Sequence, residues 1–363
     1  MRADSFVINA WYVAGFSHEF PEGKLTGQTI VRKPLVIWRD HGGSVVAFDG
    51  RCTHKRMPLK DGRLLPDGSL ECAYHGFCFK SSGACVRIPS QPETAIPARA
   101  SLRPYPVIEQ DGLVWVWVGE IDRIGDVKPP RTPEIGSSEW SSVPGEALTV
   151  PANYRLLIEN LLDITHFYPL HDGNVGDVSH STIPVELIEE TVDGNALVRT
   201  IRHARSYKQP PFLADWFGYD VVDRDHTHAM LSPGVTRVQM TLAPEGKLGT
   251  SADRGYVLHH THTPIDASHH VWRWCISTPA AHRSAKDPSQ SIAQLMAMNF
   301  PEVAAQDLWA LERQQEMFEL PDDGYQEVSV RADRAMMVAR KILAKMENDD
   351  QQAQGAQANK NAA

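Results

Sequence analysis

Four residues that can bind a metal stand in two short segments of the sequence. Cys52-Thr-His54 is followed, after seventeen residues, by Cys72-Ala-Tyr-His75. Each segment offers one thiolate and one imidazole, so two loops could deliver two ligands of each kind. A [2Fe–2S] cluster with mixed ligands needs two thiolates on one iron and two imidazoles on the other. The pattern therefore predicts such a cluster, and Gly76 lies where the backbone must pass close to it.

A zinc site with two cysteines and two histidines would use the same ligand types. Zinc fingers more often pair Cys with Cys and His with His on separate arms, whereas each arm here mixes the two. The mixed arms stand among strand-like segments, and this context favours the iron–sulfur interpretation over zinc.

A second group of polar residues lies between 160 and 171, in the segment Asn160-Leu-Leu-Asp163-Ile-Thr-His166-Phe-Tyr-Pro169-Leu-His171. Asn160, Asp163 and His166 are spaced to share one helical face. His171 would point elsewhere on an unbroken helix, but Pro169 disfavours helical backbone just before it. We therefore expect the helix to end or kink there, which lets His171 fold back beside His166. Two imidazoles and one carboxylate form the facial triad of non-haem Fe(II) oxygenases.

The elements that must position these two groups differ between the two halves of the chain. Residues 1–120 read as short strands and turns, and a polar stretch from Asp122 to about Pro144 reads as a linker. A helical segment follows around 153–167, then long β-rich stretches and two final helices. These helices are expected at about 289–318, interrupted near Pro301, and at about 330–346. The tail from Asn348 is rich in Gln, Asn and Ala, which predicts disorder.

Composition narrows the class of protein. Apolar residues make up 42% of the 363 residues and the net charge is −9, without a basic run that would attract nucleic acid or an anionic membrane. We expect no nucleic-acid or membrane partner. The N-terminus has no signal-peptide pattern, so we expect a cytoplasmic protein. Five cysteines are an odd number, and we interpret Cys78, Cys85 and Cys275 as structural rather than disulfide-bonded.

A further set of histidines, at 259, 260, 262, 269 and 270, resembles a metal cluster only at first sight. On a strand, His260 and His262 would face one side and His259 the other. Because both predicted irons already have ligands, we expect most of these side chains at the surface or in hydrogen bonds, with one or two facing a substrate pocket. The sequence does not otherwise identify substrate-binding residues.

The segment 52–75 resembles the Rieske domains of ring-hydroxylating oxygenases. It differs from the high-potential Rieske proteins of respiratory complexes, because Met57 and Tyr74 stand where those proteins have disulfide cysteines. Phe77 stands where they have a serine that bonds a cluster sulfur. Fewer hydrogen bonds to the sulfurs lower the reduction potential, so the resemblance implies a low-potential centre.

The segment 160–171 matches the mononuclear-iron motif of Rieske oxygenases at every position. In that family an Asp on a late helix completes the ligand set, and Asp307 fits best here, with Glu302 and Glu312 as alternatives. The resemblance also implies a homotrimer assembled head to tail, in which Asp163 carries electrons from His75 of one chain to His166 of the next. Asn160 is expected near the iron.

The whole chain, about 8–345, resembles homomeric oxygenase components of the phthalate dioxygenase, vanillate O-demethylase, dicamba O-demethylase and toluenesulfonate monooxygenase branch. Trp11-Tyr12 and Ile88-Pro89 agree with this. The resemblance implies an α+β protein with an all-β Rieske domain (1–122), a helix-grip catalytic domain (123–346) and a disordered tail (347–363).

The implied activity is that of a monooxygenase that hydroxylates or dealkylates an aromatic compound. It would use O2 and electrons from NAD(P)H, through a flavin reductase, a ferredoxin or both. Each subunit would contain one [2Fe–2S] cluster and one Fe(II). The alternatives are cis-dihydroxylation of an arene and a non-catalytic Rieske electron carrier. A carrier predicts a chain of about 100 residues and does not account for the motif at 160–171.

Overall fold

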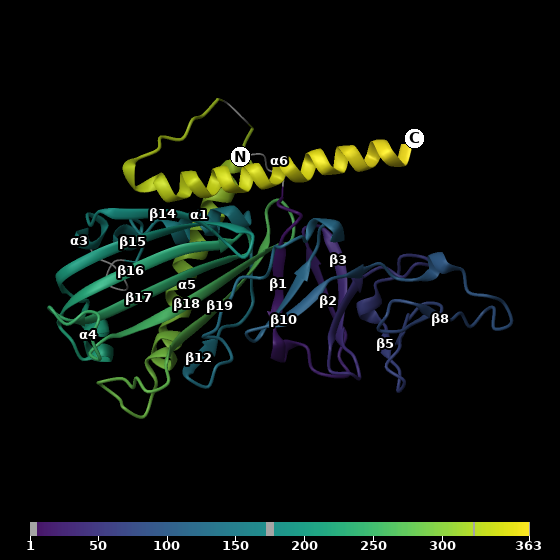
Figure 1. Ribbon diagram of the computed structural model, residues 1–363, viewed down its shortest axis with the longest axis horizontal. Helices are drawn as coiled ribbons and strands as arrows, with labels where there is room; N and C mark the ends of the chain where they lie inside the picture. The colour runs from purple at the N-terminus through teal and green to yellow at the C-terminus, as the bar shows by residue number, and fades with distance from the viewer. Residues whose placement is uncertain (1–5, 172–177, 322–323, 363) are drawn as a thin grey trace.

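The computed structural model describes residues 6–171, 178–321 and 324–362, with side chains up to residue 352. Two parts lie side by side along the longest axis of the molecule (Figure 1). The strands β1 to β11 make up one part, and a large sheet with its helices makes up the other. The two parts contain the two predicted metal-binding segments.

The N-terminal part consists of three small sheets, ordered β1-β11-β10, β2-β3-β4-β9 and β5-β6-β7-β8. All their strand pairs are antiparallel. The strands are β1 (Trp11–Phe16), β2 (Thr26–Ile30), β3 (Lys33–Arg39), β4 (Val45–Asp49), β5 (Arg63–Leu64), β6 (Leu70–Glu71), β7 (Cys78–Phe79), β8 (Cys85–Arg87), β9 (Pro104–Tyr105), β10 (Val107–Gln110) and β11 (Leu113–Trp117). β11 is buried at every position because its alternating Val and Trp residues face apolar clusters on both sides.

The C-terminal part is built on an eight-stranded antiparallel sheet, ordered β12-β19-β18-β17-β16-β15-β14 with β13 also paired to β19. Its strands are β12 (Trp140–Pro144), β13 (Leu148–Val150), β14 (Val185–Val192), β15 (Asn195–Lys208), β16 (Val221–Ser232), β17 (Val235–Pro244), β18 (Arg254–Pro264) and β19 (His270–Pro279). Hence the last residues of the predicted linker form a strand of this sheet.

Helices cover one face of the large sheet, with α5 crossing it (Figure 1). The helices are α1 (Tyr154–Leu162), α2 (Phe167–Leu170), α3 (Val178–Ser181), α4 (Pro211–Phe217), α5 (Ile292–Phe318) and α6 (Arg334–Ala362). Pro301 lies inside α5, which continues through it, so the predicted interruption is wrong. A capping box at Ser291 and Gln294 begins this helix, and a single lost backbone hydrogen bond does not end it. The predicted α+β class, with an antiparallel sheet and helices, is confirmed.

The other face of the large sheet packs against the N-terminal part. Val235 and Cys275 join the apolar cluster of Trp11 and Trp115, and Arg273 forms an ion pair with Glu19. Because both faces of β18 and β19 are covered, their histidines are buried rather than at the surface, and His260, His262 and His270 form hydrogen bonds, which was the other predicted outcome. His259 faces Glu134 at 3.6 Å, and the histidines at 260, 262 and 270 are at most 2% exposed.

The C-terminal residues differ from the predicted disordered tail, because α6 continues from Arg334 to Ala362. A buried polar contact holds this helix at Asp350. The Asp350 carboxylate accepts hydrogen bonds from the backbone N–H groups of Ile8 and Asn9, and from the Asn9 side chain at 2.6 Å. A polar composition is therefore not enough to predict a disordered tail. A single carboxylate, here that of Asp350, can bind backbone N–H groups far away in the sequence.

Replacing Asp350 with alanine is expected to lower the free energy of unfolding by about 2 kcal/mol, because three hydrogen bonds to a charged group are lost. Urea unfolding followed by circular dichroism measures the change. Asp349→Ala removes an equal charge from an exposed position next to it and serves as the control. Equal stability of the two variants would contradict the anchoring role.

Candidate metal centres

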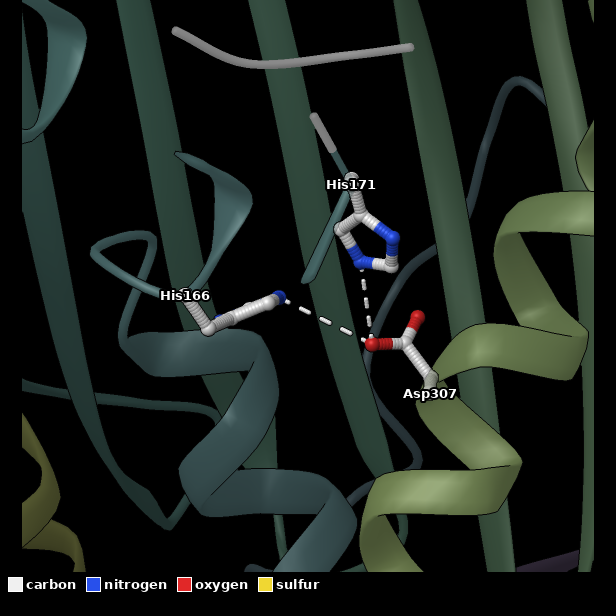
Figure 2. A group of neighbouring side chains, drawn as sticks. All are labelled: His166, His171 and Asp307. Carbon is white, nitrogen blue, oxygen red and sulfur yellow. Dashed lines mark hydrogen bonds and ion pairs between the residues drawn. The ribbon is translucent and has the colours of Figure 1, made fainter. Parts of the chain in front are cut away.

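Two histidines and one aspartate meet between α2 and α5 (Figure 2). One ligand atom from each of His166, His171 and Asp307 lies within 4.8 Å of the others. Oδ1 of Asp307 lies 3.2 Å from Nε2 of His171 and 3.7 Å from Nε2 of His166. Asp307 projects from the buried side of α5, and both imidazoles come from the ends of α2. Glu302 is exposed and Glu312 is half-buried, and neither belongs to this group.

The chain turns just before the two predicted histidine ligands because α1 ends early. Its last residue is Leu162, and Asp163 has extended backbone with φ −107° and ψ 117°. The Asp163 carboxylate accepts hydrogen bonds from the backbone N–H and the hydroxyl of Thr165, a local bond that competes with helix continuation. The predicted break before Pro169 is therefore wrong: the break comes at Asp163, and Pro169 lies within the short helix α2.

Neighbouring amides orient the group. The Nδ1–H of His171 donates to Oε1 of Gln306 at 2.7 Å, which leaves its Nε2 toward Asp307. The amide of Asn160 donates to Oδ1 of Asp307 at 3.0 Å, as expected for a residue near the centre. Burial opposes protonation of both imidazoles and lowers the pKa of His166. In His171 the hydrogen bond and charge of Asp307 outweigh burial and raise its pKa.

These residues fit a mononuclear iron. Two imidazole nitrogens and a carboxylate oxygen converge from three positions in the chain, and each imidazole turns its Nε2 toward the shared point. Such a donor set matches non-haem Fe(II). A metal ion between the two imidazoles and the Asp307 carboxylate would also separate polar groups that otherwise lie side by side in a largely buried place.

Replacing Gln306 with leucine is expected to weaken iron binding by about 10- to 100-fold, because the hydrogen bond that fixes the His171 ring is lost. Competition with a chelator measures the affinity for the mononuclear iron. The absorbance of the [2Fe–2S] cluster measures the amount of folded protein in the same sample. Gln314→Leu changes an exposed glutamine on the same helix and should leave the affinity unchanged. Equal iron affinity in both variants would rule out the orienting role.

The four residues of the first motif lie on two loops with matching hydrogen bonds. In each loop the cysteine N–H donates to the carbonyl five residues on, and the N–H four residues on donates to the cysteine carbonyl. The residue at this fourth position, Arg56 or Gly76, has a positive φ of 57° or 69°. Two equivalent loops thus present one cysteine and one histidine each.

The thiols lie inside and the imidazoles outside. Cys52 and Cys72 are each 2% exposed, whereas the His54 and His75 rings are exposed, with centroids 4.4 Å apart. Burial and the neighbouring Cys72 thiol raise the pKa of Cys52 to about 11. Two buried thiolates side by side need a cation between them, and the exposed imidazoles can ligate a second, outer iron. The arrangement fits a [2Fe–2S] cluster with mixed ligands.

The residues that replace those of high-potential centres pack on the imidazoles. Phe77 stacks on His54 at 4.9 Å, and the exposed Tyr74 lies 3.8 Å from the His75 ring. The position two residues after His75 is Phe77, which has no hydroxyl to bond a cluster sulfur. A low reduction potential therefore remains our prediction. All five cysteines are free and buried, and Cys78, Cys85 and Cys275 lie outside the two matching loops.

Sequence reasoning missed several polar residues near the second centre. Gln306 stands next to Asp307 and was visible only as part of its helix. His226 and His228 lie on β16 with their rings 6.2 Å from that of Phe167. The alternation His-Thr-His on a strand was a usable signal for two imidazoles on one face. Arg202 on β15 gave no such signal.

Fold and sites together define a two-domain protein with a Rieske-type cluster site and a separate His/His/Asp metal site. Residues 150–349 match the family model of the vanillate O-demethylase oxygenase C-terminal domain, and residues 10–106 match the Rieske [2Fe-2S] domain. The chain belongs to the vanillate O-demethylase oxygenase family and carries a Rieske domain, as its motifs predicted.

Known proteins resemble the chain over part or all of its length. The iron–sulfur subunit of a toluene-4-sulfonate monooxygenase system from Comamonas testosteroni is 36% identical over 54% of this chain and 55% of that protein. The oxygenase component of dicamba O-demethylase from Stenotrophomonas maltophilia is 36% identical over 54% of this chain and 56% of that protein. The chain thus matches about half the length of these curated relatives.

The fold similarity is broader. A crystal structure of dicamba monooxygenase bound to dicamba covers 95% of this chain and 98% of that chain, with a TM-score of 0.82 and 26% identity. Within the described residues, no helix has the length and apolar character needed to cross a membrane.

Proposed function

We propose that this protein is the oxygenase component of a multicomponent monooxygenase that demethylates or hydroxylates an aromatic compound. The convergence of His166, His171 and Asp307 in one largely buried place carries the proposal. In this proposal these three residues hold the iron, while Cys52, Cys72, His54 and His75 hold the cluster. When bound, the iron supplies oxygen activation and the cluster supplies single electrons.

The chain's own residues supply orientation and a dry environment. Gln306 holds the His171 ring, and Asn160 holds the Asp307 carboxylate. His166, His171 and Asp307 would hold a bound Fe(II), which would supply the site for O2 activation. One oxygen atom enters a C–H bond and the other leaves as water, with NAD(P)H supplying two electrons through a reductase. Hydroxylation of a methoxy carbon then releases formaldehyde and a phenol.

We propose further that the cluster of one chain serves the iron of another, in a head-to-tail homotrimer. The loops around β5 and β8 lie at the opposite end of the molecule from the large sheet (Figure 1), which argues against transfer within one chain. Asp163 is half-buried next to His166, and its backbone bonds that imidazole. We assign to its carboxylate the electron bridge toward His75 of a neighbouring subunit.

Partners and location follow from the same chemistry. A ferredoxin or flavin reductase must reduce the cluster, and the exposed imidazoles of His54 and His75 offer the shortest path for an electron. None of the cysteines in the described residues forms a disulfide, which suits a reducing compartment, so we propose the cytoplasm. The names of the dicamba and vanillate relatives support demethylation over cis-dihydroxylation.

A turnover screen tests the proposed activity. The purified holoenzyme, a generic NADPH-driven ferredoxin and reductase pair, and O2 are mixed with methoxyaromatic, N-methyl and aryl-carboxylate compounds. We expect formaldehyde in proportion to the O2 consumed with at least one methylated compound. O2 uptake with a diol product and no formaldehyde would contradict demethylation, and a colourless zinc protein would contradict the whole proposal.

A further inference from the structure

A row of charged and thiol side chains crosses the small sheet β5-β6-β7-β8, which carries the second cluster loop, the one with Cys72 and His75. Its members stand directly opposite one another in successive strand pairs: Arg63 on β5, Glu71 on β6, Cys78 on β7 and Arg87 on β8. Directly opposite residues of antiparallel strands project from the same face, so their side chains can interact. Glu71 precedes the ligand Cys72, and Cys78 follows the ligand His75 by three residues. The row therefore flanks the second loop at both ends.

Two arginines hold the one acid of this row. Nε of Arg63 donates to Oε1 of Glu71 at 2.9 Å, and Nη2 of Arg87 donates to Oε2 of the same carboxylate. The Glu71 side chain is 14% exposed, whereas those of Arg63 and Arg87 are 73% and 53% exposed. Two positive charges and one negative charge give the row a net charge of +1. This charge lies next to the residues that bear the second pair of cluster ligands.

Cys78 connects the row to the backbone of the second loop. Nε of Arg87 donates to Sγ of Cys78 at 3.1 Å, and the thiol donates to the carbonyl oxygen of Gly76 at 3.3 Å. The Glu71 carboxylate is a second acceptor for the thiol, 3.8 Å away. Burial raises the pKa of the Cys78 thiol, so the thiol keeps the proton that it donates. Because Gly76 directly follows the ligand His75, these hydrogen bonds end on the peptide that fixes the loop.

The first cluster loop lacks such a row. Arg51 stands at its position equivalent to Glu71, and Pro58 stands at the position equivalent to Cys78, because both pairs bridge the two ends of their loops. A proline side chain offers no hydrogen-bond donor to the loop, and Arg51 bonds Asp49 instead. The connection from an arginine through a thiol to the loop backbone is therefore specific to the second loop.

We propose that Arg87 and Cys78 are positioning residues that hold the second loop and raise the reduction potential of the cluster. A cluster that takes up one electron gains one negative charge, so a positive charge nearby stabilises its reduced form. The net positive charge of the row acts in this direction. It opposes the effect of Phe77, which offers no hydroxyl to a cluster sulfur. The row thus makes the cluster easier for an electron donor to reduce, whatever the reaction at the mononuclear iron.

A redox titration of the holoprotein tests the charge effect without requiring turnover. The cluster is reduced stepwise at pH 7 and low salt, and its EPR signal is recorded against the solution potential. In Arg87→Gln we expect reduction to become about 3- to 10-fold less favourable, a fall of about 30–60 mV for one electron. Glu71→Gln should raise the potential instead. The double variant should return close to the wild-type potential, because the net charge of the row is again +1, and Arg87→Lys should keep the wild-type potential.

A second pair of variants separates the hydrogen bond of Cys78 from the charge of the row. Cys78→Ala removes the bond to the Gly76 carbonyl without changing a charge, so we expect shifted EPR g values with a smaller change in potential than in Arg87→Gln. Cys78→Ser keeps a donor at this place and should restore the wild-type g values.

Arg131→Gln is the matched control for Arg87→Gln. Arg131 is also an exposed arginine bonded to a half-buried acid, but its partner Asp111 lies between β10 and β11, in another sheet. Its loss should leave the potential unchanged. An unchanged potential in Arg87→Gln, or an equal fall in Arg131→Gln, would overturn the charge effect, and wild-type g values in Cys78→Ala would overturn the role of the thiol.

The same measurements keep this inference separate from the proposed function. If no methylated compound is demethylated but the potential falls in Arg87→Gln, the proposed activity is refuted and the tuning of the cluster stands. If formaldehyde is released but the potential does not depend on Arg87, the tuning is refuted and the proposed activity stands.

Discussion

Replacing Asp307 with alanine is expected to reduce turnover by at least about 100-fold and the iron content from about three to about two per chain. The two imidazoles of His166 and His171 remain, but two neutral ligands do not hold Fe(II) as a facial triad does. The absorbance and EPR signal of the reduced cluster should survive, because its loops lie at the other end of the molecule (Figure 1). Iron analysis with EPR on the same sample measures both effects.

Two acids on the same helix provide matched controls for Asp307. Glu302→Ala and Glu312→Ala remove a carboxylate from α5 outside the His166 and His171 group, and both should keep iron and turnover. Full iron content in Asp307→Ala, together with loss of iron from either control, would contradict the account. The third iron ligand would then be Glu302 or Glu312.

Replacing Asp163 with asparagine is expected to slow turnover by about 10- to 100-fold while both metal centres keep their iron. The amide oxygen can still accept from the Thr165 N–H, so the turn after α1 should persist. The side chain no longer carries the charge that stabilises an imidazole on either side of the bridge. Stopped-flow absorbance of the cluster, after reduced protein is mixed with O2 and substrate, measures electron transfer directly.

A second variant separates the charge of Asp163 from the shape of its turn. Thr165→Val removes the hydroxyl that donates to the carboxylate at 2.8 Å but keeps the charge. It should transfer electrons at close to the wild-type rate. If Thr165→Val were as slow as Asp163→Asn, the effect would come from loop geometry and not from the bridge.

Much of the candidate sites was predictable because their ligands stand close together in sequence. Cys52 and His54, or His166 and His171, are brought together by one turn, and turn chemistry is local. Asp307 was predictable only through the resemblance, since nothing local links it to residues more than a hundred positions earlier. Gln306 could not be predicted, because its role depends on which way the His171 ring turns.

The fold was predictable where it depends on local sequence patterns. It was uncertain where contacts between distant segments determine which residues are buried and where a helix ends. Alternation placed His259 and His260 on opposite faces, but it could not show that the N-terminal part covers the outer face. Pro169 was the strongest breaker signal, yet the side-chain bond from Asp163 to Thr165 ended α1 first. The anchor at Asp350 also depends on contacts with the N-terminus, more than three hundred residues away.

Mixed assemblies test most directly the claim that the cluster of one chain serves the iron of another. Asp307→Ala lacks the iron, and Cys72→Ser lacks the cluster, so each homomer should be inactive with a methylated compound that the wild type demethylates. The two chains are coexpressed with different affinity tags, and assemblies that contain both are purified. We predict formaldehyde release by the mixed assemblies. Inactivity of mixed assemblies that contain both metal centres would contradict transfer between chains.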